Sequence, residues 1–126
     1  MTLTTVILLV MLLFVAQLFL QETSRYRFNL RQIMGNRDTR PKESIIAARL
    51  DRAKNNMLEA LPLFLGLAML ALVKGGDTSG TANGATLFLI ARIIYVPIYA
   101  TGIPVLRSLV WLAGMAGLVM MALPLV

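Results

Sequence analysis

The chain has 126 residues, of which 58% are hydrophobic and only 14% are charged. Soluble domains contain roughly 45–50% apolar and about 25% charged residues, and a domain of this size cannot bury such an apolar surplus in its own core. Cysteine and histidine are absent, which excludes disulfides, a thiol nucleophile and the commonest general base and metal ligand. The net charge of +6 is unevenly placed, because nine of the twelve Lys and Arg lie between Arg25 and Lys54.

The first hydrophobic segment, residues 3–21, is long enough to cross the hydrocarbon core of a bilayer. No positive residue precedes it and no Ala-x-Ala site follows it, so we expect an uncleaved span rather than a signal peptide. Residues 22–44 are polar and basic, with turn signals at Gly35-Asn36 and Pro41. We expect a cytoplasmic loop or a short interfacial segment here, not a site for nucleic acid.

Residues 45–73 are predicted to form one long helix with a charged beginning and an apolar remainder. At about 1.5 Å per residue this helix exceeds the ~30 Å hydrocarbon core, so its first turns would project from it. The Gly-rich segment 74–84 is predicted to be a flexible loop. Two more spans follow at 84–101 and 104–124. Because the connections between the last three spans are short, we expect neighbouring spans to be antiparallel. The sequence therefore predicts an all-α, up-down bundle of four transmembrane helices in the single domain 1–126.

The positive charges also predict the orientation of the spans. The basic segment 22–44 should lie in the cytoplasm, which places both termini outside and the turn before Arg107 inside. The segment 74–84, with one Lys and one Asp, would lie outside. We therefore expect a multi-pass integral membrane protein in contact with membrane lipids.

Polar and charged residues recur within the spans, where a charge costs at least ~2.5–3.5 kcal/mol near the bilayer centre. On the second span they lie at steps of three or four and so share one helix face: Arg49, Arg52, Asn56 and Glu59. The last two spans carry similar sets: Arg92, Tyr95 and Tyr99, then Arg107, Ser108 and Trp111. From the direction of each span, all these faces are expected to meet near the inner surface.

Two interpretations of these polar residues are open. In the first, they only hold the helices together, with Glu59 paired to Arg92 and Asn56 bonded to a backbone carbonyl. In the second, they bind a ligand, since one buried Glu cannot neutralise Arg52, Arg92 and Arg107 together. The surplus of positive charge favours an anionic small molecule or a lipid headgroup.

Two sequence blocks resemble the MAPEG family, the membrane-associated proteins in eicosanoid and glutathione metabolism. The run RLDRAKNNMLEALPLF, from Arg49 to Phe64, resembles the family signature, with a core of Arg52, Asn56, Glu59 and Pro62. The run ARIIYVPIYATGIPVLRSLVW resembles its third-to-fourth-helix segment, with Arg92, Tyr95, Tyr99, Arg107 and Ser108 in place. The chain looks most like a small bacterial branch, which suggests the bacterial inner membrane.

The resemblance implies a homotrimer that binds glutathione between neighbouring subunits near the cytoplasmic leaflet. Arg107 would be catalytic and lie by the sulfur, where a cation lowers the pKa of a thiol. The candidate residues for binding glutathione or an anionic lipid are Arg49, Arg52, Asn56, Glu59, Arg92, Tyr95, Tyr99, Ser108 and Trp111. Two positions depart from many members: Asn55 stands where an Arg is frequent, and Trp111 where a Tyr is frequent.

Two functions follow from these residues. The protein is either a glutathione transferase or peroxidase acting on lipophilic electrophiles or lipid hydroperoxides, or a non-catalytic protein that holds an anionic lipid or amphiphile between subunits. The second is favoured by the two departures and by the excess of basic residues. A channel or transporter ranks third, because the sequence has no half-helix pair or inverted repeat. No metal site is expected.

Overall fold

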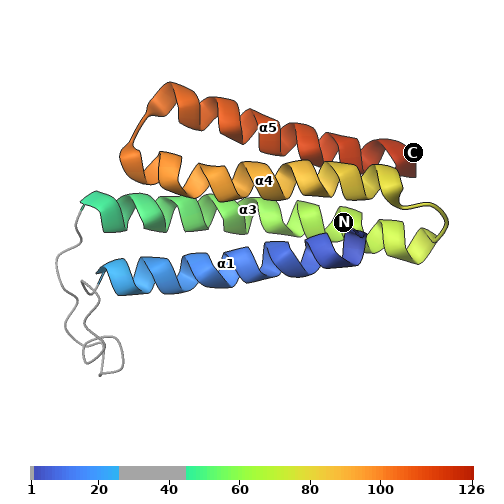
Figure 1. Cartoon of the computed structure of the whole chain (residues 1–126), viewed down its shortest axis with the longest axis horizontal. Helices are drawn as coiled ribbons and strands as arrows, with labels where there is room; N and C mark the ends of the chain where they lie inside the picture. Colours follow the sequence, from blue (N-terminus) through green and yellow to red (C-terminus); the bar gives the residue numbers. More distant parts are fainter. Residues whose placement is uncertain (1, 26–44) are drawn as a thin grey trace.

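Long antiparallel helices make up the protein (Figure 1). The structure, a computed structural model, describes residues 2–25 and 45–126, so most of the predicted loop 22–44 lies outside the described residues. The described helices are α1 (Leu3–Arg25), α3 (Ile45–Lys74), α4 (Ser79–Thr101), α5 (Pro104–Ala122) and the short 3-10 helix η1 (Leu123–Leu125). The predicted all-α bundle of four long helices is confirmed.

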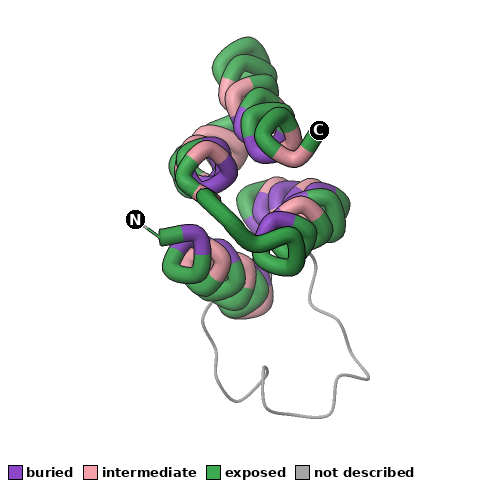
Figure 2. The backbone as a smooth tube through the Cα atoms, turned by 90° about the vertical axis from the view of Figure 1, so that its right-hand side faces the viewer, coloured by how far each residue is buried: buried purple, intermediate pink, exposed green. Residues whose placement is uncertain are grey.

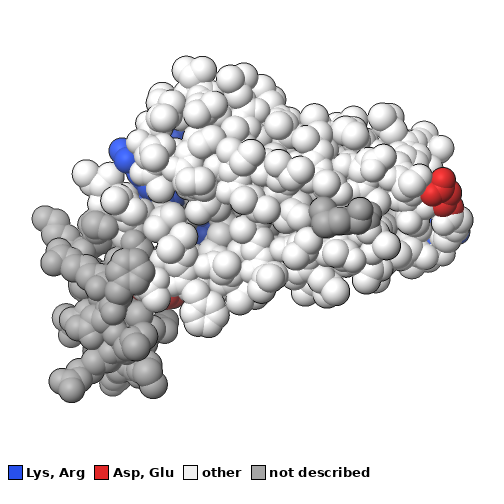
Figure 3. Space-filling model, in the orientation of Figure 1, with Lys and Arg blue, Asp and Glu red and all other residues white. Residues whose placement is uncertain are grey.

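The four long helices are each long and apolar enough to cross a membrane. Large apolar side chains are freely exposed on them, for example Leu8 (61%), Leu63 (60%) and Leu109 (58%). Uncharged residues cover most of the visible surface, and basic side chains gather at the end that carries the turn between α4 and α5 (Figure 3). So much exposed apolar surface suits lipid and not water. The protein is therefore a multi-pass integral membrane protein.

The core lies between α1, α3 and α4, and Leu118 and Met121 of α5 join it. On α3, buried residues recur at steps of three or four and so occupy one face: Ala53, Met57, Ala60, Phe64, Ala68 and Ala71. The ring of Phe64 stacks on Phe88 of α4, with centroids 4.8 Å apart and planes inclined by 17°. Figure 2 shows the buried positions turned toward the middle of the bundle. The repeated alanines allow α3 to approach its neighbours closely.

α4 begins at Ser79, whereas the sequence prediction placed its start at 84. Gly80 therefore lies inside a helix, where an added Cβ would be 2.9 Å from the proline ring of η1. Within the segment 74–84, the positive φ angles that build the turn are those of Gly75 and Gly76, at 72° and 79°. The prediction of a flexible loop across the whole segment was wrong, because its later glycines permit close packing rather than a turn.

α5 packs mainly on α4 and lies at the edge of the bundle (Figure 2). The two helices approach most closely at two glycines. A Cβ on Gly84 would be 2.6 Å from the carbonyl oxygen of Gly117, and a Cβ on Gly117 would be 2.8 Å from the amide nitrogen of Phe88. From this contact the helices diverge toward the turn at Gly102 (Figure 1). The divergence makes room for polar side chains at that end of the molecule.

Candidate functional site

A cavity of about 490 Å³ lies between α3, α4 and α5, on the side where α5 has diverged from α4. Its walls are Asn56, Tyr95, Tyr99, Arg107, Ser108, Trp111 and Leu112. All of these except Leu112 were predicted from the sequence to share one site. The structure thus brings polar faces of three helices together at one end of the bundle.

Arg107 lies in the first turn of α5 and is half-buried. Its Cζ atom is 5.1 Å from the centre of the Tyr99 ring, a cation–π arrangement. That ring in turn lies 5.4 Å from the ring of Tyr95, with the two planes tilted by 59°. No described residue hydrogen-bonds the guanidinium of Arg107. Its N–H donors therefore remain free for a ligand in the cavity.

Ser108 and Trp111 follow Arg107 along the wall of the cavity. The hydroxyl of Ser108 donates to the carbonyl oxygen of Pro104 at 3.1 Å, which leaves its oxygen as an acceptor. Trp111 is 38% exposed and is the single tryptophan of the chain. Its indole gives this wall an apolar surface and can donate one hydrogen bond.

Arg92 is buried, with only 3% of its surface exposed. Its Nη1 donates to Oδ1 of Asn56 at 2.6 Å, and its Cζ lies 5.2 Å from the ring centre of Phe88 and 5.3 Å from that of Tyr95. The sequence had suggested a Glu59–Arg92 ion pair and a backbone partner for Asn56, and both suggestions were wrong. Asn56 is the half-buried residue that faces α4, whereas Glu59 is exposed.

A second cavity of about 160 Å³ shares Asn56 and Trp111 with the first. Its other walls are Glu59, Ala60, Leu63, Arg92 and Met115. The apolar members of both cavities were missed by the sequence analysis, because the helices that carry them are apolar almost throughout. Helical spacing alone points to all four of them, since each follows a predicted site residue by four positions: Ala60, Leu63, Leu112 and Met115.

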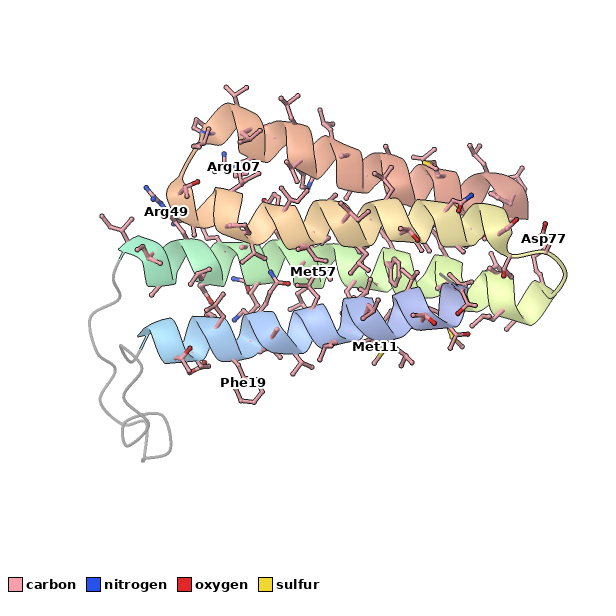
Figure 4. The ribbon with its side chains drawn as sticks, viewed as in Figure 1. Met11, Phe19, Arg49, Met57, Asp77 and Arg107 are labelled. Atoms are coloured by element: carbon pink, nitrogen blue, oxygen red, sulfur yellow. The ribbon has the colours of Figure 1, made fainter. Side chains whose placement is uncertain are left out.

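Arg49 and Arg52 line neither cavity. The Nη1 of Arg49 donates to the carbonyl oxygen of Ala100 at 3.0 Å. The guanidinium also lies against Gly102, where φ is 77°: a Cβ built on this glycine would be 2.7 Å from the Cζ of Arg49. The last carbonyls of a helix carry partial negative charge, and α4 has no basic residue in its own last turn. Arg49 of α3 places a positive charge at this end of α4 (Figure 4). Arg52, by contrast, is exposed.

Among the residues that the structure describes, one cation and several hydrogen-bonding groups line the larger cavity, and no carboxylate does. Its volume is within the roughly 300–1,000 Å³ common for small-molecule sites. Among residues 2–25 and 45–126, no group of three or more His, Cys, Asp or Glu lies together to hold a metal ion. The donor set is therefore suited to an anionic organic ligand with further polar groups.

The fold and the site define a class: a four-helix membrane protein with a cationic cavity between its last three helices. The chain belongs to the MAPEG family, whose model matches residues 1–126, the whole chain. The family is glutathione-related, and its members are membrane proteins that typically form oligomers. No curated protein and no solved structure matches this chain.

Proposed function

We propose that the protein binds glutathione in the 490 Å³ cavity and holds its sulfur, as the thiolate, beside Arg107. The main support is the guanidinium of Arg107, which lies over the Tyr99 ring with its N–H donors free. Bound glutathione would supply a thiol nucleophile. A cation beside that thiol favours the ionised, reactive form. Membership of a glutathione-related family adds support.

The other polar residues would hold the tripeptide. Within the cavity, the hydroxyls of Tyr95 and Tyr99 suit the carboxylates of glutathione. Arg52 and Glu59 lie outside the walls of this cavity and would bind a carboxylate and the amino group only where the tripeptide extends beyond it. The second substrate would be a lipophilic electrophile or a lipid hydroperoxide. It would arrive from the bilayer past the apolar wall near Trp111.

Neighbouring copies of the chain would complete this site. Only 22% of the apolar stretch of the last helix is buried within one protomer, and the walls contributed by α5 lie at the edge of the bundle. We propose a homotrimer, with these cavities at the cytoplasmic side of a bacterial inner membrane as the positive-inside rule favours. Light scattering of the protein–detergent complex measures the oligomer. A monomeric mass would contradict this part.

The test is calorimetric titration of glutathione and of S-methylglutathione into the purified protein, with ultraviolet absorbance to detect bound thiolate. We expect both peptides to bind and glutathione to show the thiolate band. Arg107→Ala should lose that band and still bind S-methylglutathione. Asn55→Ala, an exposed neighbour of Asn56, is the matched control and should behave as the wild type. Failure of both peptides to bind the wild type would refute the proposal.

A second candidate is retention of an anionic lipid or amphiphile without catalysis. It is favoured by the apolar wall of Trp111 and Leu112 beside Arg107, which gives a headgroup a cation and a chain an apolar surface. Native mass spectrometry of the detergent-purified protein is the measurement. A retained lipid that is lost in Arg107→Ala would support this function, and the absence of any bound lipid would contradict it.

A further inference from the structure

Asn56 lies between the two cavities and lines both of them, whereas Arg92 lines only the smaller one. The Oδ1 atom of Asn56 accepts a hydrogen bond from Nη1 of Arg92 at 2.6 Å. A guanidinium has only donors, so an amide beside it must present its oxygen and not its nitrogen. The Nδ2 group of Asn56 therefore points away from Arg92, and it is the polar group of this side chain that is left for the larger cavity.

The guanidinium of Arg92 is held in place on several sides. It is buried, and the ring centres of Phe88 and Tyr95 lie 5.2 and 5.3 Å from its Cζ. The backbone of α5 passes close by at Gly114, where an added Cβ would be 3.7 Å from Nε. Among the described residues Asn56 is its only hydrogen-bond partner, since Nε and Nη2 have none. The reversed amide would set N–H against N–H beside a buried cation, which is costly.

The Nδ2 group of Asn56 is accessible to a ligand. Asn56 is half-buried, and its Nδ2 is not among the buried polar atoms that lack a partner. No residue in the described part of the chain accepts a hydrogen bond from it. Both N–H donors of this group therefore remain available.

Other groups around the larger cavity are donors as well. The guanidinium of Arg107 and the indole of Trp111 can only donate, and the hydroxyls of Tyr95 and Tyr99 can donate or accept. With the amide of Asn56 held by Arg92, α3 contributes a third group that offers only donors to the cavity. Such a set selects a ligand by its acceptor oxygens.

We propose that Arg92 is a positioning residue, which fixes the amide of Asn56 as a donor to a carbonyl or carboxylate oxygen of the ligand in the larger cavity. Arg92 acts through Asn56 and does not touch the ligand, unlike the direct binding role that the sequence suggested. The identity of the ligand rests on the proposed function, whereas the orientation of the amide does not.

Asn56→Asp tests the orientation without any ligand. An aspartate keeps one oxygen toward Arg92 and replaces the Nδ2 donor by a second oxygen. We expect its midpoint temperature of unfolding to be no lower than that of the wild type, because the carboxylate pairs with a buried cation. Asn56→Ala, which removes the oxygen, should unfold at a lower temperature. An Asp variant as unstable as the Ala variant would overturn the orientation.

Calorimetric titration with S-methylglutathione should show the opposite effect of the same change. Asn56→Asp should weaken binding about tenfold or more, because an anionic acceptor then faces an acceptor oxygen. Asn55→Asp is the control, since it adds the same charge at an exposed neighbour that lines neither cavity.

Equal affinity of these two Asp variants would overturn the donor role of Asn56 and leave the proposed function intact. Failure of the wild type to bind the peptide would instead refute the proposed function and the ligand part of this inference. The comparison of stabilities would then decide the orientation by itself.

A spectroscopic signature tests Arg92 directly. In protein with isotope-labelled asparagine, the side-chain amide signals of Asn56 are identified by their absence in Asn56→Asp. S-Methylglutathione should shift these proton signals downfield in the wild type. Arg92→Lys keeps a side chain with only donors and should keep the shift. Arg92→Gln, whose amide can donate or accept, should lose most of the shift and bind the peptide several-fold more weakly.

A shift that is unchanged in Arg92→Gln, or lost equally in both Arg92 variants, would overturn the positioning role. If neither of these variants folds, the comparison of Asn56→Asp with Asn55→Asp still decides the proposal.

Discussion

The two ends of the α4–α5 pair are built on different principles. At one end, Gly84 and Gly117 bring the two backbones into direct contact. At the other end the helices have diverged, and the space between them and α3 holds Arg92 and Arg107 beside aromatic rings. The helices are connected by a short turn at this open end, where Gly102 closes α4 with a positive φ.

The difference shows how a small membrane bundle can be closely packed at one end and hold a cavity at the other. Without a hydrophobic driving force between helices in lipid, close packing of small residues holds them together. The same lipid makes buried cations costly unless they have partners. Tight glycine packing at one end stabilises a diverged end in which cations remain available for ligands. Substitutions at each end should therefore differ in what they disturb.

The largest effect is expected at the glycine contact. Gly117→Ala would place a methyl group 2.8 Å from backbone atoms of α4, which cannot move aside as a side chain can. We expect a loss of about 3 kcal/mol in the free energy of unfolding, measured by thermal or denaturant unfolding in detergent with Trp111 fluorescence. Gly66→Ala is the control, since nothing lies within 4 Å of its added Cβ. Equal stability of the two variants would contradict the tight contact.

At the open end, the bond between Arg92 and Asn56 should contribute next most. Asn56→Ala removes the acceptor of the 2.6 Å hydrogen bond and leaves a third donor of the buried guanidinium unpaired. A loss of about 2 kcal/mol is expected, as for hydrogen bonds to charged groups. Asn55→Ala, an exposed neighbour, should change the unfolding midpoint little. A similar loss in both variants would show that the bond is not what stabilises this end.

Arg49 should contribute about 1 kcal/mol through its hydrogen bond to Ala100 and its charge at the end of α4. The local signature is more telling than the stability. In Arg49→Ala, amide hydrogen exchange should increase at the turn around Gly102 and not in the middle of α3. Arg49→Lys should restore part of the protection. Arg52→Ala, exposed one turn further along, is the control; equal exchange at the turn in Arg49→Ala and Arg52→Ala would argue against the proposed contact.

The smallest effect is expected at Asp77, far from the open end (Figure 4). Hydrogen bonds from the backbone N–H of Ser79, at 2.9 Å, and then from its hydroxyl hold the pKa of Asp77 below its usual value. Because the pKa of Asp77 is lower in the folded than in the unfolded protein, the ionised side chain stabilises the fold at any pH above its unfolded-state pKa. This stabilisation is lost as the pH falls through its folded-state pKa. Acidification should therefore lower the midpoint temperature of unfolding slightly less in Asp77→Asn than in the wild type. An identical acid response in both proteins would count against the contact.

The sequence by itself determined the number of spans and most residues of the candidate site. Four apolar stretches of sufficient length require four crossings, because a backbone in lipid must satisfy its own hydrogen bonds within helices. Helical spacing then placed Asn56 and Tyr95, Tyr99 and Arg107 on faces that the structure brings to one cavity. The identity of the family was also visible in the two motif blocks, and the whole-chain match bears it out.

Only the tertiary structure decided which partner each polar residue has. Spacing fixes the residues that share a helix face, but not the rotation of that helix or its angle to the next one. Arg49 therefore reaches Ala100 rather than the cavity, and Arg92 meets Asn56 rather than Glu59. The packing of Gly84 on Gly117 sets the angle between α4 and α5. That angle decides how α5 encloses Arg92, which no pattern in the sequence could have revealed.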